Sequence, residues 1–430
     1  MAIDRDRLQA LHTREEAAFV AAHPRSAELA EQAGAHLLGG VPMNWMARWP
    51  GAFPVFVAEA SGSRFTDVDD RDYVDFCLGD TGAMTGHARP FVTEAIAAQA
   101  ARGLTTMLPS EDAIWVGGEL ARRFGLPVWQ MAMTATDANR FVLRLARHLT
   151  GRPKVAVFDW CYHGTVDEAF AVLDDDGRVV AREGNTGPAV DPAVTTTVVP
   201  FNDVAALEAA LAAGDVACVL AEPALTNIGI VLPDPGFHDA LRSLTRAAGA
   251  LLVIDETHTI CAGPGGYTAA HSLAPDLLTI GKPIGGGVPA AAYGMTQSLA
   301  DRLADFVSDP DTDISGIGGT LTASALASAA VRATLSNTLR DEDYAHTIPL
   351  ATRWAEGVAD VIGRHGLPWH VQQLGCRAEY WFCPPPRDGA AAAAAVDHDL
   401  EAFLHLYALN RGVLLTPFHN ICLLYTSRCV

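Results

Sequence analysis

Short apolar runs alternate with helical patterns from about residue 111 to residue 296, and this alternation limits the possible folds more than any other feature. Apolar spacing predicts helices over 112–124, 137–149, 204–213 and 236–248, and strands over 154–159, 217–221, 250–255 and 277–280. Strands that are apolar throughout and separated by helices indicate a parallel sheet covered on both faces. Ligands of such α/β sheets bind beyond the carboxyl ends of the strands. The residues that follow each strand are therefore the first candidates for a site.

The two ends of the chain have a different pattern. The N-terminal end predicts a helix and two small strands, whereas a proline run and six alanines near residue 390 predict a loop that enters a helix of a smaller domain. A chain of 430 residues is long enough for two or three domains. We expect an N-terminal helix with small-domain strands, a large domain and a C-terminal small domain, over 1–75, 76–335 and 336–430.

Charge and cysteine usage exclude several classes of function. A net charge of -20 argues against nucleic acid and against an anionic membrane surface as partners. No apolar stretch is long enough to span a membrane, and the first 40 residues do not resemble a secretory signal. The eight cysteines are scattered without CxxC spacing, which favours free thiols in a reducing compartment over disulfides or a metal site. We expect a cytoplasmic protein that binds no metal.

Lysine is rare in this chain, which has only Lys154 and Lys282 among its 30 basic residues. Where a positive charge alone is needed, arginine is used instead. A lysine that persists provides what arginine cannot, an amine that can lose its proton and attack a carbonyl. Lys282 stands in the glycine-rich run Thr-Ile-Gly-Lys-Pro-Ile-Gly-Gly-Gly and is a candidate nucleophile. Lys154, just before a predicted strand, is interpreted as a surface charge.

Asp255 ends the buried run Ala-Leu-Leu-Val-Ile-Asp. A carboxylate there is costly to desolvate without a cationic partner, and a pyridinium N–H is such a partner. Taken alone, Asp255 is equally well interpreted as a helix cap or a loop acid. The next predicted strand decides between these interpretations, because it would bring Lys282 back to the same edge of the sheet. A lysine and an acid in this arrangement are what pyridoxal phosphate (PLP) requires.

A phosphate site and a ring-stacking group have weaker signals. Thr134-Ala135-Thr136 opens a predicted helix, where backbone N–H groups and the helix dipole favour an anion, although such residues also cap ordinary helices. Tyr162 follows a strand and offers a ring to a cofactor, although a lone aromatic is more often part of the core. The loop at Thr320 offers a second phosphate donor.

The ordered motifs resemble those of the class III (subgroup II) aminotransferases of PLP fold type I, a family with glutamate-1-semialdehyde aminomutases and ω-transaminases. The motifs are Gly86-His87, Tyr162-His163-Gly164, Glu222-Pro223, Asn227, Gly229, Pro235-Gly236-Phe237, Asp255-Glu256, Gly281-Lys282 and Gly319-Thr320. The resemblance implies an α/β large domain with a mostly parallel seven-stranded sheet covered by helices. It also implies a smaller α+β domain formed by the N- and C-terminal segments.

The resemblance implies roles for individual residues. Lys282 would carry PLP as a Schiff base and relay protons, Asp255 would pair with the pyridine nitrogen, and Tyr162 would stack on the ring. Thr257 would lie below the other face and Asn227 near the 3-hydroxyl. Thr320 would reach the phosphate of a partner subunit, so a homodimer with shared sites is implied. The full set of implied cofactor contacts is Ala135, Thr136, Tyr162, His163, Glu222, Asn227, Asp255, Thr257, Lys282 and Thr320.

The chain departs from these relatives around the expected substrate pocket. Trp45, Trp49 and Trp160 are interpreted as pocket walls that favour a hydrophobic amine or amino acid. Arg48 is a candidate carboxylate clamp, although a surface arginine is the plainer interpretation. The arginine that relatives often have shortly after the Asp-Glu pair is absent. Residues 424–430 match no expected helix, so the small domain is expected to lack its last helix.

The favoured function is amino transfer between an amine or amino acid and a keto acid, ketone or aldehyde, in two half-reactions. An aminomutase of the glutamate-1-semialdehyde type and a PLP racemase are the alternatives within the same fold. A catalytically silent scaffold protein is the alternative from another class, and the intact Lys282, Asp255 and Tyr162 argue against it.

Overall fold

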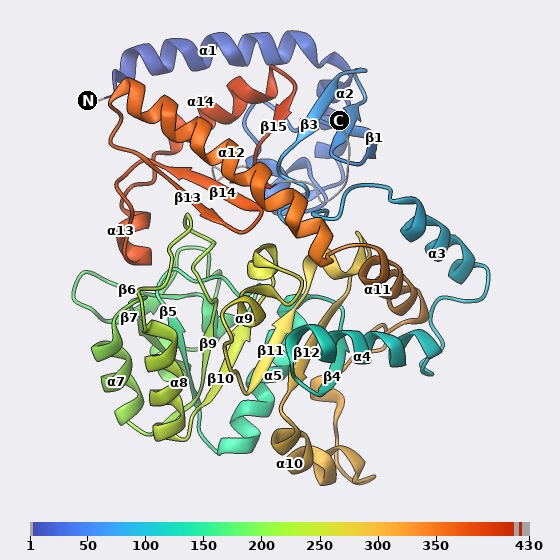
Figure 1. Ribbon diagram of the computed structural model, residues 1–430. Helices are drawn as coiled ribbons and strands as arrows, with labels where there is room; N and C mark the ends of the chain where they lie inside the picture. The colour runs from blue at the N-terminus through green and yellow to red at the C-terminus, as the bar shows by residue number, and fades with distance from the viewer. Residues whose placement is uncertain (1–2, 417–420, 424–430) are drawn as a thin grey trace. The chain divides into compact units, whose positions relative to one another are not determined.

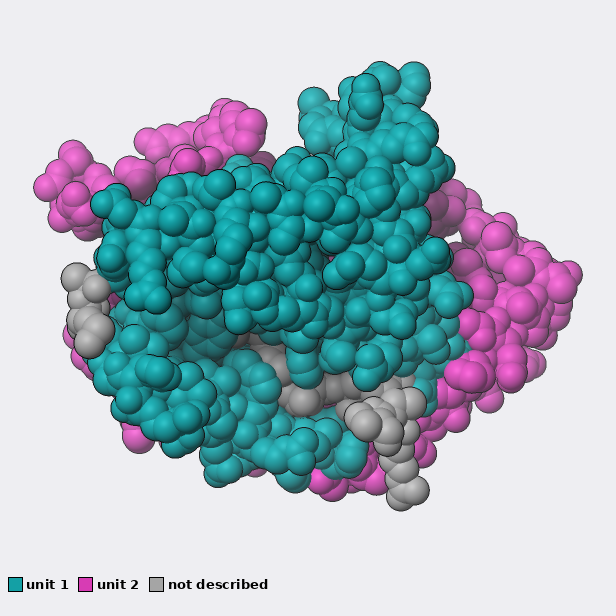
Figure 2. Space-filling view, turned by 90° about the horizontal axis from the view of Figure 1, so that it is seen from above, with its two compact units in different colours: residues 1–89, 346–384, 395–430 teal, residues 90–345, 385–394 magenta. Residues whose placement is uncertain are grey.

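The computed structural model describes residues 3–416 and 421–423, and these residues divide into two compact units (Figure 2). Unit 1 contains residues 1–89, 346–384 and 395–430, and unit 2 contains residues 90–345 and 385–394. None of the helices in the described part of the chain is long and apolar enough to cross a membrane.

Unit 2 is built on a seven-stranded sheet (Figure 1). In spatial order its strands are β4 (Val128–Ala132), β12 (Ala291–Met295), β11 (Leu277–Ile280), β10 (Leu251–Asp255), β9 (Val216–Ala221), β5 (Lys154–Phe158) and β8 (Thr196–Val199). β12 is antiparallel to both of its neighbours, and the other pairs are parallel. β9 and β10 are buried along their whole length, as expected of strands covered on both faces. The predicted α/β fold with a mostly parallel seven-stranded sheet is confirmed.

The helices of unit 2 begin and end at residues suited to helix ends. Thr134 caps α5 by accepting a hydrogen bond from the Asp137 N–H, and Gly151 ends α5 with a φ of 67°, a left-handed conformation that glycine adopts easily. The helices are α3 (Pro90–Ala100), α4 (Glu111–Phe124), α5 (Ala135–Thr150), α6 (Pro192–Thr195), α7 (Val204–Ala212), α8 (Phe237–Ala248), α9 (Gly266–Ala270), α10 (Gln297–Ser308), α11 (Ala325–Asn337) and α13 (Gly389–Ala393). A small hairpin joins β6 (Ala171–Leu173) and β7 (Val179–Ala181).

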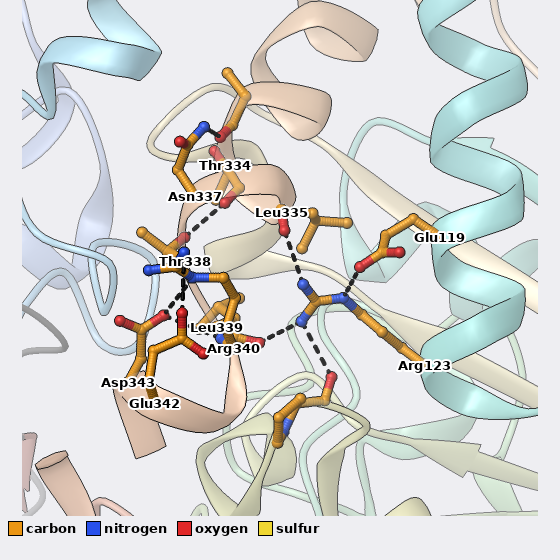
Figure 3. Close-up of polar contacts among 12 residues, drawn as sticks. Glu119, Arg123, Thr334, Leu335, Asn337, Thr338, Leu339, Arg340, Glu342 and Asp343 are labelled. Atoms are coloured by element: carbon orange, nitrogen blue, oxygen red, sulfur yellow. Dashed lines mark hydrogen bonds and ion pairs between the residues drawn. The ribbon is translucent and has the colours of Figure 1, made fainter. Parts of the chain in front are cut away.

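A buried arginine joins three parts of unit 2 (Figure 3). Arg123 of α4 forms an ion pair with Glu119, with 2.7 Å between Nε and Oε1. Its guanidinium also donates to the carbonyl of Leu335 at 2.8 Å and to that of Leu339. The last carbonyls of a helix have no partner within the helix. Arg123 therefore satisfies the carboxyl end of α11 while its own charge is paired.

Unit 1 contains two sheets and a small aromatic core. One sheet has the order β1 (Val57–Ser61), β2 (Arg64–Asp67), β3 (Asp72–Asp75) and β15 (Val413–Leu414), and the other β13 (His370–Leu374), β14 (Arg377–Trp381) and β16 (Ile421–Leu423). Its helices are α1 (Arg5–Ala22), α2 (Pro24–Gly34) and α14 (His398–Leu409), and α12 (Asp341–His365) begins in unit 2 and continues into unit 1. Phe19, Phe65, Tyr73, Leu406 and Leu409 form a buried cluster.

The compact units divide the chain at 89/90 and 345/346, whereas the expected domain boundaries were 75/76 and 335/336. His87 explains the first difference, because it binds Asp75 at 2.8 Å and forms a β-bridge with Gly62 in unit 1. The alanine-rich helix expected in the small domain lies in unit 2 instead. Next to this helix, the Arg387 carbonyl accepts a hydrogen bond from Asn202 Nδ2 at 2.8 Å, and the Arg387 side chain forms an exposed ion pair with Asp234 at 2.9 Å.

Candidate functional site

Asp255 lies at the carboxyl end of β10 and is buried. Its Oδ2 accepts hydrogen bonds from Asn139 Nδ2 at 2.8 Å and from His163 Nδ1 at 2.9 Å, and its Oδ1 accepts from the Thr257 N–H at 3.0 Å. Burial opposes ionisation, but the hydrogen bond and the charge of His163, with the other donors, lower the pKa of Asp255 to about 2. Asp255 is therefore a carboxylate at neutral pH, set in a fixed orientation.

The segment 160–163, which follows β5, makes a separate contact from each of its four residues. The Arg182 guanidinium lies over the Trp160 ring, 5.1 Å from its centroid, and the Cys161 carbonyl accepts from Arg182 Nη1 at 3.0 Å. The Tyr162 N–H donates to Glu222 at 3.1 Å, and the His163 ring binds Asp255. Burial works against a charged His163, but its neighbours Cys161 and Asp255 hold its pKa well above the ordinary value.

The start of α5 lies beside the segment that leads to Lys282. Gly281 makes this approach possible, because a Cβ added there would lie 3.0 Å from Ala135 Cβ and 3.2 Å from the Ala135 nitrogen. The first N–H groups of a helix have no partner within the helix, and the Thr134 hydroxyl caps the N–H of Asp137. Thr136 Oγ1 accepts from the Thr165 N–H at 3.0 Å and keeps its own proton for another acceptor. Ala135 and Thr136 thus lie where an anion beside Lys282 would meet N–H and O–H donors.

Lys282 follows β11 and opens a short 3-10 helix, η5 (Lys282–Gly285). Its φ is 49°, a left-handed value that is uncommon for a side chain with a Cβ. Its Nζ lies 2.5 Å from Nε2 of His258. β10 and β11 are adjacent and parallel, so Lys282 and Asp255 follow neighbouring strands at the same edge of the sheet, as predicted.

Glu222 and Asn227 lie in the loop after β9. Glu222 is buried and accepts hydrogen bonds from the N–H and the hydroxyl of Thr226, and burial raises its pKa. In the amide orientation that satisfies both groups, Asn227 Oδ1 accepts from Arg182 Nη2 at 2.8 Å. The guanidinium of Arg182 also lies over the Trp160 ring, 5.1 Å from its centroid, and burial lowers the pKa of Arg182. Arg182 therefore orients Asn227 and packs against Trp160.

The remaining predicted residues occupy varied environments. Thr257 is buried beside Asp255, and its Oγ1 has no hydrogen-bond partner among the described residues. Thr320 is exposed in the turn before α11. Trp45 and Arg48 are exposed and Trp49 is half-buried, and all three belong to unit 1, whereas the other predicted site residues belong to unit 2. The pocket roles of Trp45, Arg48, Trp49 and Trp160 stay predictions, and so does the role of Thr320.

The roles of three residues of the site were not predicted from the sequence. Asn139 was expected only as the end of the phosphate segment that begins at Thr134, whereas it binds Asp255; it is four residues after Ala135, on the same face of α5, and this spacing was a usable signal. His258 is recognisable only from strand register. Asp255 pairs with Thr279, and His258 and Lys282 are each three residues after one member of this pair. Arg182 follows the β6–β7 hairpin and had no signal in the sequence. No cluster of three or more His, Cys, Asp or Glu side chains suited to a metal ion occurs within 3–416.

Comparisons with known proteins identify the family of this chain. The profile of the Aminotransferase class-III family matches residues 45–352. A glutamate-1-semialdehyde 2,1-aminomutase of Desulfitobacterium hafniense (strain Y51) is 33% identical over 398 residues, which cover 91% of each chain. A crystal structure of a glutamate-1-semialdehyde-aminomutase from Pseudomonas aeruginosa PAO1 is 51% identical, with a TM-score of 0.97 over 100% of this chain and 96% of that one.

Two further structures bear on the site. A lysine-to-alanine variant of the Pseudomonas aeruginosa aminomutase was crystallised in complex with PMP. An omega-transaminase from Sphaerobacter thermophilus is 28% identical, with a TM-score of 0.85 over 94% of this chain and 93% of that one. With a family profile that spans most of its length and relatives matched almost end to end, this chain belongs to the class-III aminotransferases.

Proposed function

We propose that this chain binds pyridoxal 5'-phosphate and moves an amino group between an amine or amino acid and a keto acid, ketone or aldehyde. The observation that carries the proposal is the placement of Lys282 and an ionised, buried Asp255 at the ends of adjacent parallel strands. The relatives crystallised with PLP or PMP support the cofactor.

The residues present fit this cofactor. The Asp255 carboxylate, oriented by His163 and Asn139, suits a protonated pyridine nitrogen. The N–H groups at the start of α5 and the Thr136 hydroxyl suit its phosphate. The Thr257 hydroxyl is buried next to Asp255 without a hydrogen-bond partner among the described residues, and a bound cofactor would supply one. Tyr162 would stack on the ring, Asn227 would meet the 3-hydroxyl, and Glu222 would hold Tyr162 in place through its N–H.

A cofactor held by these residues would supply an electron sink for the C–H bond of the substrate that breaks. The protein supplies the proton transfers. Lys282 Nζ, as a neutral amine, removes the proton from the substrate carbon and returns one at the next step. Asp255 keeps the ring nitrogen protonated, because a carboxylate with a low pKa remains charged when the ring is charged.

The two lysines provide a matched test of this assignment. Lys282→Arg and Lys154→Arg both keep a positive charge, but only the first removes the amine that bonds to the cofactor. Lys154 is paired with Asp215 at 3.0 Å, away from the strand ends that form the site. We expect the visible absorption band of the holoenzyme to disappear in Lys282→Arg and to persist in Lys154→Arg. A band retained in Lys282→Arg would refute the assignment.

An aminomutase, which keeps both half-reactions on one substrate, is the second candidate. The names of the relatives favour it, whereas the apolar segment around Trp45 and Trp49 favours a larger hydrophobic donor. A panel of amino donors added to the holoenzyme separates the two. If hydrophobic amines discharge the visible band and keto acids restore it, amino transfer stands. If only a diamino or amino-aldehyde acid does so, the aminomutase assignment replaces it, and racemisation without loss of the band would exclude both.

We also propose a homodimer located in the cytoplasm. Met107, Leu108 and Ile114 of unit 2 are 72–79% exposed, and a second copy would cover these apolar side chains. In that dimer Thr320 would reach the partner's phosphate site. The cysteines of residues 3–416 are free, which suits a reducing compartment. Light scattering should give twice the chain mass, and Leu108→Asp should shift the protein to the monomer. A wild-type monomer would refute the dimer.

A further inference from the structure

We propose that His258 positions the reactive amine of Lys282 by accepting a hydrogen bond from its Nζ. The inference rests on the proposed function, in which Lys282 Nζ removes and returns a proton. It assigns a role in that reaction to one more residue, which is not part of the motifs that resemble the family. Nζ of Lys282 and Nε2 of His258 are 2.5 Å apart.

Strand register brings the two side chains together. Asp255 and Thr279 are paired at the ends of the parallel strands β10 and β11. His258 is three residues after Asp255, and Lys282 is three residues after Thr279. The two segments therefore leave the edge of the sheet side by side. The strand register therefore places the two residues close enough for their side chains to meet.

The backbone around His258 is fixed by the buried side chain of Glu256. Its carboxyl oxygens accept hydrogen bonds from the Thr259 hydroxyl at 2.5 Å and from the N–H groups of Tyr267 at 3.0 Å and Thr268 at 2.5 Å. The Glu256 N–H donates to the carbonyl of Thr279 at 2.9 Å, which ties the turn to β11. His258 thus projects from a rigid turn, as a group that positions another side chain must.

The chemistry of the two nitrogens sets the direction of the bond. A neutral amine has two N–H donors and one lone pair, and a neutral imidazole has one nitrogen that accepts. When Nζ donates to Nε2, the His258 proton is on Nδ1 and the lone pair of Nζ points elsewhere. That lone pair takes the substrate proton. A neighbour that donated to Nζ would occupy the lone pair and block this step.

The length of the side chain at position 258 tests the proposal. Gln places its amide oxygen near the position of Nε2, whereas Asn reaches only the position of Nδ1. His258→Gln and His258→Asn are therefore two polar variants that differ by one methylene. His271→Asn is a control, because His271 is an exposed histidine of the same loop region and stacks on Tyr267.

The first measurement is the rate at which an amino donor discharges the visible band of the holoenzyme in a single turnover. Misplacement of a reacting group by about 1 Å costs roughly 100-fold in rate. We expect a loss of that size in His258→Asn, with donor affinity unchanged and a larger isotope effect for an α-deuterated donor. His258→Gln should remain within about 10-fold of wild type, and His271→Asn should match wild type. Equal rates in the Gln and Asn variants would refute a role that depends on hydrogen bonding.

The second measurement does not depend on turnover. With lysine labelled by nitrogen-15, the chain gives side-chain signals from only Lys154 and Lys282. In the complex with pyridoxamine phosphate, the hydrogen bond should slow exchange of the Nζ protons, so that the Lys282 signal is visible in wild type and His258→Gln and absent in His258→Asn. Lys154 serves as the internal reference in every sample. A Lys282 signal unchanged in His258→Asn would overturn the proposal.

The two measurements separate this inference from the proposed function. If no amino donor discharges the wild-type band, the proposed reaction is wrong, but the nuclear magnetic resonance comparison still tests the contact. If amino donors react and the Lys282 signal is the same in wild type and in the His258 variants, the proposed reaction is supported and the role of His258 is refuted.

Discussion

Asn139 should be the most costly polar side chain of the site to remove. It is fully buried in α5, donates to Asp255 Oδ2 at 2.8 Å and to the His163 carbonyl at 3.1 Å, and accepts from Thr279 Oγ1 at 2.8 Å. Asn139→Ala leaves all three partners without it. A hydrogen bond to a charged group contributes about 1.5–3 kcal/mol and a neutral one about 1 kcal/mol, so the three together give about 3.5–5 kcal/mol.

Urea unfolding followed by far-ultraviolet circular dichroism measures this loss as a lower midpoint. Asn337→Ala is the matched control, because Asn337 is exposed and donates only to the Ala333 carbonyl of its own helix. The control should change the free energy of unfolding by no more than about 0.5 kcal/mol. Asn139→Leu separates bond loss from cavity formation, since it keeps nearly the same size and shape but has no hydrogen-bonding group. If Asn139→Ala costs no more than the control, the reasoning about this network is wrong.

Three further predictions concern pH, backbone space and helix capping. The pKa of Asp255 is lowered from an ordinary 3.8 to about 2. The pair with His163 should therefore contribute about 2–3 kcal/mol of stability that is present above pH 4 and lost as the pH falls to 2. Because the pKa of His163 is raised, it should add stability that is present below about pH 6.5 and lost as the pH rises through its folded pKa. Unfolding midpoints between pH 2 and 9 should show both slopes, and His163→Asn should flatten them. Gly266→Ala should cost more than about 2 kcal/mol in thermal unfolding, because its φ is 65° and a Cβ would lie 2.3 Å from a Glu256 oxygen. Gly214→Ala is the control, because its φ is 73° but the space around it is open, and it should cost about 1 kcal/mol. Equal losses in the two variants would exclude the steric explanation. Thr134→Ala should lose about 1 kcal/mol through the cap of α5, and no change in melting temperature would contradict that role.

Much of the fold followed from the sequence because its signals are local. β9 is apolar throughout and β10 is apolar up to Asp255, and capping residues such as Thr134 mark where helices begin. The positions of Asp255 and Lys282 followed from one general rule, that ligands bind at the carboxyl ends of parallel strands.

What the sequence did not reveal depends on distant contacts. The contact between His258 and Lys282 requires the register of two strands, which no local pattern records. The alanine-rich helix carries no apolar periodicity that could indicate its partner, and its place in unit 2 depends on backbone contact at Gly389 and on the hydrogen bond that the Arg387 carbonyl accepts from Asn202. Arg182 directly follows the β6–β7 hairpin, and its contacts with Trp160 and Asn227 join segments that are far apart in the sequence.

The segment 160–163 has a consequence for how enzymes with this site can diverge. Along the segment, Trp160 and Cys161 contact Arg182, and the next two residues contact Glu222 and Asp255. Inserting or deleting one residue would therefore shift every later contact by a position. Side chains there can be exchanged, but the length of the segment is fixed. New substrate preferences that preserve these contacts must therefore arise by substitution within the segment or by changes elsewhere in the chain.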